Sequence, residues 1–160
     1  MKTYRNEKDG FEIDLPDGWS LHKDRAAPFW NFIFRLFRGW TPHVNVAFTC
    51  GPNEILNLVI EPMKPELSPE DTRRLFAHTV QNNRVYSNLE FGRITVGGKS
   101  HTWVRYLMFD KVWSKKYMIV LGGNGYAITA SCNGYEMFLQ REIIWDEIVS
   151  SLRLIPSSEE

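Results

Sequence analysis

Residues 89–132 read LEFGRITVGGKSHTWVRYLMFDKVWSKKYMIVLGGNGYAITASC. Four runs rich in β-branched and aromatic residues are separated here by Gly97-Gly98, by a loop through Asp110 and Lys111, and by a glycine-rich turn over residues 122–125. Short glycine turns between such runs are typical of β-hairpins. The stretch therefore predicts an antiparallel meander.

Strand signals also precede this meander. In GFEIDLPDGW (residues 10–19), Phe11, Ile13 and Leu15 alternate with acidic residues and a Pro-Asp-Gly turn follows, so we expect a half-buried strand with a second one around 20–23. TPHVNVAFTC (residues 41–50) alternates in the same way, and a Gly-Pro-Asn segment returns the chain into ILNLVIEP (residues 55–62). These two runs predict a further hairpin.

Two helices are expected against the sheet. Ser68 as N-cap, Pro69 at the first helical position and Asp71 three residues after the cap predict a helix that begins at 68 and ends near 82–83. A second helix is predicted from about 135 to 151, with one apolar face and a smaller stripe of Leu139 and Ile143 roughly opposite. Its apolar face contains Phe138, Trp145, Ile148, Val149 and Leu152.

Composition indicates one folded domain. The chain has 160 residues, of which 43% are hydrophobic and 24% charged, and this excludes a disordered chain. We therefore predict a single α+β domain over 1–160, with an aromatic-rich insertion at about 26–40. Its sheet is antiparallel and helices lie against it.

Charge and hydropathy exclude some partners. Lys plus Arg and Asp plus Glu both total 19, and this balance argues against nucleic-acid binding. No apolar run has the length of a signal peptide or a transmembrane span. We expect a soluble, cytoplasmic protein, unless a leader was removed, and we expect Cys50 and Cys132 to be reduced thiols.

No complete catalytic motif is present, and we predict neither an enzyme nor a cofactor. The segment around Gly97, Gly98 and Lys99 departs from a phosphate-binding loop because Arg93 stands where a glycine is needed. His43 and His101 are both expected on strands, where they could bind a metal together with Glu61, but ordinary polar histidines are the favoured interpretation.

Glu142 and Asp146 are spaced four residues apart on the last predicted helix. Such a carboxylate pair could serve acid–base chemistry. We interpret the two residues instead as solvated charges on the polar side of that helix.

The segment AAPFWNFIFRLFRGW (residues 26–40) carries the most functional information. As a helix, its apolar arc would span about 200°, roughly twice what docking on a sheet requires. The surplus edge is formed by Trp30 and Phe34 and runs into Arg38, with Arg35 beside it. Trp30, Phe34, Arg35 and Arg38 are our candidate partner-binding residues, and the alternative is that these aromatics belong to the core.

The order of these features resembles the PsbP-like superfamily, which includes photosystem II extrinsic proteins, DcrB-type bacterial lipoproteins and a Ran-binding nuclear import factor. The resemblance is carried by GFEIDLPDGW, ITVGGKSHTWVRYLM, GGNGYAITASC and the closing IVSSLRLIP. It implies an α/β/α sandwich with a central antiparallel sheet of about six or seven strands flanked by helices, in proteins that act mostly as accessory, assembly or binding modules. The chain lacks the lipid-attachment cysteine of the lipoprotein branch.

We therefore expect a non-enzymatic binding or assembly module that engages a protein partner, or a second copy of itself, through the aromatic and basic segment. A peripheral contact with a membrane surface is an alternative use of that segment. Two other functions stay open: a chaperone-like carrier of hydrophobic peptide segments, as in DcrB-like proteins, and a small metal-dependent hydrolase.

Overall fold

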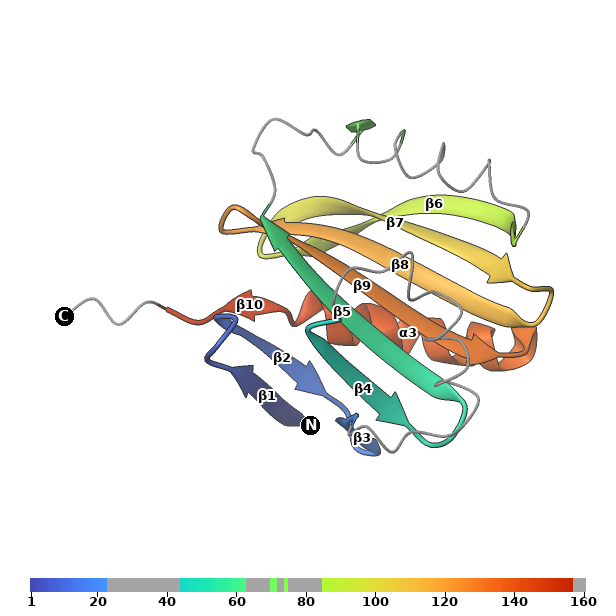
Figure 1. Cartoon of the computed structure of the whole chain (residues 1–160), viewed down its shortest axis with the longest axis horizontal. Helices are drawn as coiled ribbons and strands as arrows, with labels where there is room; N and C mark the ends of the chain where they lie inside the picture. Colours follow the sequence, from blue (N-terminus) through green and yellow to red (C-terminus); the bar gives the residue numbers. More distant parts are fainter. Residues whose placement is uncertain (23–43, 63–69, 72–73, 75–84, 157–160) are drawn as a thin grey trace.

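A computed structural model describes residues 1–22, 44–62, 70–71, 74 and 85–156 (Figure 1). Most of the chain that it describes belongs to antiparallel strands, and one long helix packs against them.

The larger sheet has seven strands in the order β3-β4-β5-β9-β8-β7-β6. The four runs of the meander form its second half, where β6 to β9 pair in sequence, each antiparallel to the next. The hairpin β4-β5 then joins through β5 to β9, with nine residue pairs in register. The strand bounds are β3 Trp19–Leu21, β4 Val46–Cys50, β5 Glu54–Pro62, β6 Tyr86–Val96, β7 Lys99–Met108, β8 Val112–Leu121 and β9 Asn124–Asn133.

Glycine pairs close two of the meander's hairpins. Gly97 and Gly98 connect β6 to β7 with φ of 59° and 75°, and Val96 pairs with Lys99 across the turn. Two successive residues with positive φ define the turn that matches strand twist, and glycine adopts it without strain. The interpretation of this segment as a hairpin turn, and not as a phosphate loop, is confirmed.

A second sheet of three strands lies beside the first and joins distant parts of the chain. β2 (Phe11–Leu15) pairs with β1 (Lys2–Asn6) on one side and with β10 (Arg153–Leu154) on the other. The strand at 11–15 follows the predicted alternation, since Phe11, Ile13 and Leu15 are buried. β1 and β10 were not predicted from the sequence.

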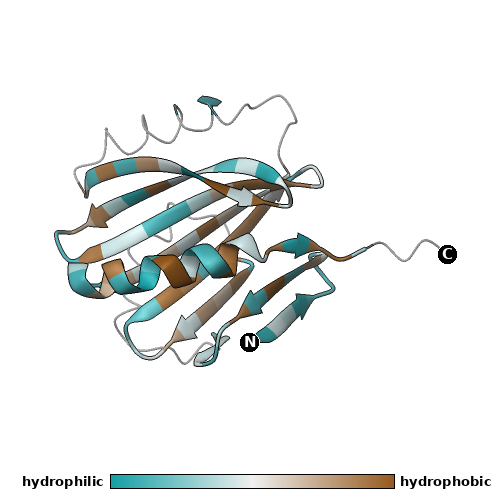
Figure 2. Ribbon diagram, turned by 180° about the vertical axis from the view of Figure 1, so that it is seen from behind, coloured by the Kyte–Doolittle hydropathy of each residue, from teal (hydrophilic) through white to brown (hydrophobic). Residues whose placement is uncertain are grey.

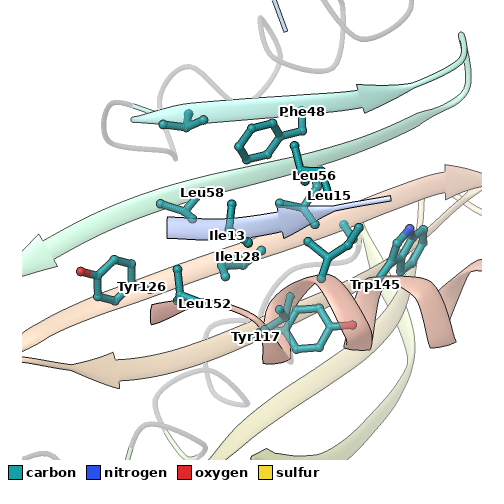
Figure 3. Packing of buried hydrophobic residues seen from close by; sticks show 14 of the residues in the cluster. Ile13, Leu15, Phe48, Leu56, Leu58, Tyr117, Tyr126, Ile128, Trp145 and Leu152 are labelled. Atoms are coloured by element: carbon teal, nitrogen blue, oxygen red, sulfur yellow. The ribbon is translucent and has the colours of Figure 1, made fainter. Parts of the chain in front are cut away.

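The helix α3 (Tyr135–Ser150) lies across one face of the larger sheet (Figure 2). The five residues predicted for its buried face are all at most 2% exposed. They pack with inward residues of β2, β4, β5, β8 and β9 into the main core, part of which Figure 3 shows. A smaller apolar cluster of Val104, Tyr106, Met108 and Val112 occupies the opposite face of the sheet.

The predicted α+β class with an antiparallel sheet of about six or seven strands is confirmed by the seven-stranded sheet. The flanking by helices is confirmed only in part, because α3 is the one long helix among the residues described. Of the helix predicted to begin at 68, residues 70, 71 and 74 are helical, and its other residues fall outside the described ranges. In the described ranges, no helix has the length and hydropathy needed to cross a membrane.

Cys50 and Cys132 are free thiols on β4 and β9, which flank β5 on opposite sides. Two strand spacings put their backbones about 9.6 Å apart, beyond the roughly 7 Å limit for a disulfide. We expect thiol titration of denatured protein, prepared without reductant, to find two thiols per chain. In native protein both should react more slowly, since burial raises the pKa of Cys132 to about 12 and also raises that of Cys50.

Treatment with reductant before denaturation is the control and should leave the count at two. A lower count that reductant restores would contradict this prediction.

Candidate functional site

The partner-binding residues predicted from the sequence, Trp30, Phe34, Arg35 and Arg38, lie outside the described residues. Their assignment stays a prediction. In the described part of the chain, the candidate functional groups gather around α3, as a charged cluster beneath it and an apolar stripe along its outer face.

The charged cluster forms where α3 crosses β6, β7 and β8. Glu90, Arg105 and Lys115 pair side by side across these three strands, so their side chains share one row on the face that α3 covers. Glu142 and Asp146 come down from α3, four residues apart and therefore on one side of the helix. Two acids of the helix thus meet two bases of the sheet.

Lys115 is the centre of this charged cluster. Its side chain is only 3% exposed, and its Nζ lies 2.8 Å from Oδ1 of Asp146 and 3.4 Å from Oε2 of Glu142. The ammonium also stands 4.2 Å from the centre of the Trp103 ring, within the range of a cation–π contact. A buried charge is tolerated only when it is paired in this way.

Arg105 extends the charged cluster toward the sheet edge. Its guanidinium forms an ion pair with Glu90 on β6 and donates from Nη1 to Oε1 of Glu142 at 3.2 Å. Glu142 therefore contacts both bases, Arg105 and Lys115. Removal of any one member would leave another without a full complement of partners.

Tyr117 completes the polar part of the charged cluster. Its hydroxyl donates to Oδ1 of Asp146 at 2.6 Å. Burial raises the pKa of Tyr117, and the negative charge of Asp146 raises it further. A phenol with a raised pKa stays protonated at neutral pH, so Tyr117 here donates a hydrogen bond and does not act as a base.

A glycine in β6 makes room for Trp103. A Cβ at Gly92 would lie 2.0 Å from Cζ2 of the Trp103 indole. The indole therefore lies against the bare backbone of β6, and its Nε1 donates to the carbonyl of Arg93 at 3.2 Å. The φ of Gly92 does not lie in the left-handed region, so backbone conformation does not require a glycine here. The close approach of the indole does.

The interpretation of Glu142 and Asp146 as solvated charges is wrong. Their side chains are 19% and 39% exposed, and both are bound to sheet residues. A sequence signal does exist: Lys115 interrupts the inward row of β8, between Trp113 and Tyr117. A lysine at an inward position requires a counter-charge from the element packed above it.

A second buried ion pair lies on the same face of the sheet. Glu54 is 1% exposed and accepts hydrogen bonds from Nε of Arg141, at 2.9 Å, and from the indole of Trp145. Nη2 of Arg141 also contacts Sγ of Cys50 at 3.6 Å. α3 is thus held to the sheet by one ion pair at Glu54 and by the charged cluster around Lys115.

His101 is bound to backbone through both ring nitrogens. Nε2 lies 3.1 Å from the carbonyl of Val96, and Nδ1 accepts from the N–H of Val120 at 3.3 Å, so the neutral ring carries its proton on Nε2. Burial lowers the pKa of His101. Its proposed metal partner His43 lies outside the described residues, within which no three metal-binding side chains converge.

The apolar stripe consists of Tyr135, Leu139 and Ile143, which are 50%, 44% and 64% exposed. Their spacing of four residues puts them in one row along α3, in which Leu139 and Ile143 face away from the sheet and Tyr135 lies at the margin of the sheet-facing side. The sequence predicted Leu139 and Ile143 to lie opposite the buried face, and their exposure confirms it. Tyr135 was missed; its ring centre lies 4.8 Å from that of Trp113.

Asp146→Asn tests the charged cluster. The substitution leaves the Lys115 ammonium with one carboxylate, Glu142, and should lower the free energy of unfolding by about 2–3 kcal/mol. This is less than the roughly 3–5 kcal/mol for a fully buried pair, because water reaches Asp146. The neighbouring exposed residue supplies a matched control, Glu147→Gln, which should change stability by no more than about 0.5 kcal/mol in urea unfolding. Equal effects of the two variants would show that the cluster does not stabilise the fold.

The lowered pKa of the buried His101 predicts how the free energy of unfolding depends on pH. Because its pKa is lower in the folded state than in the unfolded state, the unfolded chain binds more protons as pH falls below about 7. The free energy of unfolding should therefore decrease between pH 7.5 and pH 5, and His101→Gln should remove that part of the decrease. Urea unfolding at the two pH values measures it, with His22→Gln as control. A pH dependence unchanged in His101→Gln would contradict the buried neutral ring.

Comparisons with known proteins bear on the fold. The sequence matches no protein-family model, and it matches no curated protein. Solved structures are similar: cyanobacterial PsbP (CyanoP) from Synechocystis sp. PCC 6803 is 19% identical, with 96% of this chain and 91% of that chain covered and a TM-score of 0.63. A point mutant of the protein Mog1 is 10% identical, with 98% and 97% covered and a TM-score of 0.61.

Both similarities extend over nearly the whole of each chain, at identities too low for a conclusion about shared activity. They bear out the resemblance drawn from the sequence, and the chain has the PsbP-like fold.

Proposed function

We propose that this chain is a non-enzymatic binding module that engages a protein partner. The observation that carries the proposal is the apolar stripe on α3, where Tyr135, Leu139 and Ile143 are each at least 44% exposed along one side of a helix. Single exposed apolar residues are ordinary on protein surfaces, but adjacent ones at helical spacing indicate an interaction site.

The polar groups of the described residues support a binding role over catalysis. The Lys115 ammonium is already paired with two carboxylates, and the raised pKa of Tyr117 keeps its hydroxyl protonated. The hydrolase alternative would need His43 or His101 beside a carboxylate in a cleft. Both nitrogens of His101 are used by backbone groups, which disfavours that alternative.

The aromatic and basic segment is the second surface of this proposal. Trp30 and Phe34 would supply apolar contact area, and Arg35 and Arg38 positive charge. A carrier of hydrophobic peptide segments would use the same residue types, so this chaperone-like function remains the runner-up. Two free thiols are consistent with the cytoplasmic location that we propose.

The proposal is tested by affinity capture from a lysate of the source organism, with the full chain as bait and mass spectrometry as readout. Leu139→Ser with Ile143→Ser should abolish capture of a specific protein and leave stability nearly unchanged, because both side chains are exposed. Trp30→Ser, Phe34→Ser and Arg38→Glu together test the aromatic segment. The control is Thr95→Ala, at an exposed position on β6.

Capture lost in either set of variants but retained by Thr95→Ala would support a binding module and identify its surface. The proposal would be contradicted if all baits retained the same protein equally, or if no bait captured a protein. Release of a hydrophobic peptide segment from the purified chain would favour the carrier instead.

A further inference from the structure

Acidic residues lie along the apolar stripe on α3. At about 100° per residue, Tyr135, Leu139 and Ile143 span an arc of roughly 80°. Glu142 falls about 20° outside this arc, and Asp146 falls within it, between Tyr135 and Leu139. Glu136 and Glu147 fall beside the arc on the other side, next to Ile143. Glu142 and Asp146 are already paired with Arg105 and Lys115, so a partner that covers the stripe meets carboxylates mainly along the edge formed by Glu136 and Glu147.

Positive charge is absent from the outward side of this helix. Arg141 is the one basic residue of α3, and it pairs with the buried Glu54. Glu136 and Glu147 are exposed and form no ion pair with any residue in the described ranges. As far as the described residues go, the outer face of α3 thus combines exposed apolar residues with negative charge that has no ion-pair partner.

Glu147 lies at a position where a negative charge destabilises the helix. It lies in the last turn of α3, which has no basic residue, and there the helix dipole is negative. A lysine at this position would interact favourably with the free carbonyl groups, whereas a glutamate is repelled. Glu136, in the first turn, has a favourable dipole interaction and needs no further explanation. The stability of α3 therefore does not explain the negative charge of Glu147.

We propose that the apolar stripe of α3 docks an amphipathic helix of a protein partner, whose own apolar residues are bordered by Lys or Arg. This inference rests on the proposed function and names the chemistry of the partner. The stripe extends over eight residue steps, or about 12 Å of helix, which two to three turns of a partner helix would match. Apolar contact supplies the attraction, and the negative border of Glu136 and Glu147 supplies specificity.

The same charges argue against two other occupants. A second copy of the chain would bring an equally acidic α3 against this one and set like charges opposite each other. An anionic membrane surface would repel the carboxylates in the same way. Docking of a basic partner is the arrangement that covers the stripe and also pairs the negative border of Glu136 and Glu147.

The test uses two labelled synthetic helices that differ only in charge. Both are 18-residue amphipathic peptides with leucines on one face, bordered by lysines in one peptide and by glutamates in the other. Fluorescence anisotropy at low salt should show about tenfold tighter binding of the lysine peptide to the native chain, since several exposed ion pairs form at once. Glu136→Lys with Glu147→Lys should reverse this preference.

Two variants provide the controls. Glu7→Lys with Asp17→Lys changes the net charge by the same amount at exposed positions outside α3, and it should retain the preference for the lysine peptide. Leu139→Ser with Ile143→Ser should weaken binding of the lysine peptide. Glu147→Lys alone should raise the Tm by about 1–4 °C, as expected where a charge opposes the helix dipole.

Equal binding of the two peptides, or a preference that the α3 variants leave unchanged, would overturn the inference. If capture from the lysate is still lost in Leu139→Ser with Ile143→Ser, the binding function stands and only the basic partner is wrong. The inference would also be overturned if the native chain associated with itself, or bound vesicles of phosphatidylcholine and phosphatidylserine, and the variants in α3 abolished that binding.

Discussion

A buried ammonium group must have a counter-charge, and the counter-charges of Lys115 in the described part of the chain both lie on α3. Asp146 and Glu142 reach Nζ at 2.8 and 3.4 Å, so the helix is bound to the sheet at one rotation and one height. An apolar residue at position 115 could supply equal or greater stability but would accept several helix positions. The ion pairs thus specify which side of α3 faces the core, and therefore which side is left to solvent.

The cross-strand rows of the sheet explain why the contacts beneath α3 form one unit. Glu90, Arg105 and Lys115 share one row, and Gly92, Trp103 and Tyr117 share the next. Trp103 lies over the missing side chain of Gly92 on one strand and presents its ring to Lys115 on another. The long side chains of one row are therefore positioned by the aromatic side chains of the other. A shift of register in β6 would disturb both rows.

Local patterns in the sequence predicted the elements, whereas the contacts between elements were predicted less well. The glycine pairs and the alternation predicted the meander, and helical spacing predicted both the buried and the exposed side of α3. Glu142 and Asp146 were predicted to be solvated because helical periodicity uses only the polarity of residues in the helix. It contains no information about a lysine in a distant strand. β10 has two residues, and only its pairing with β2 makes it a strand. The partner-binding assignment of Trp30, Phe34, Arg35 and Arg38 concerns residues outside the described ranges.

The pairing of β5 with β9 has a consequence for the order of folding. The hairpins from β6 to β9 join neighbouring parts of the chain and close over short loops, so they can form rapidly. β5 must instead find a partner about 70 residues further along, and β2 must find β10 more than 130 residues away. The entropic cost of closing these long loops is offset only after the meander has formed and β9 is available as an unpaired edge strand. During synthesis, β3, β4 and β5 therefore cannot join the meander until β9, its last strand, has been made.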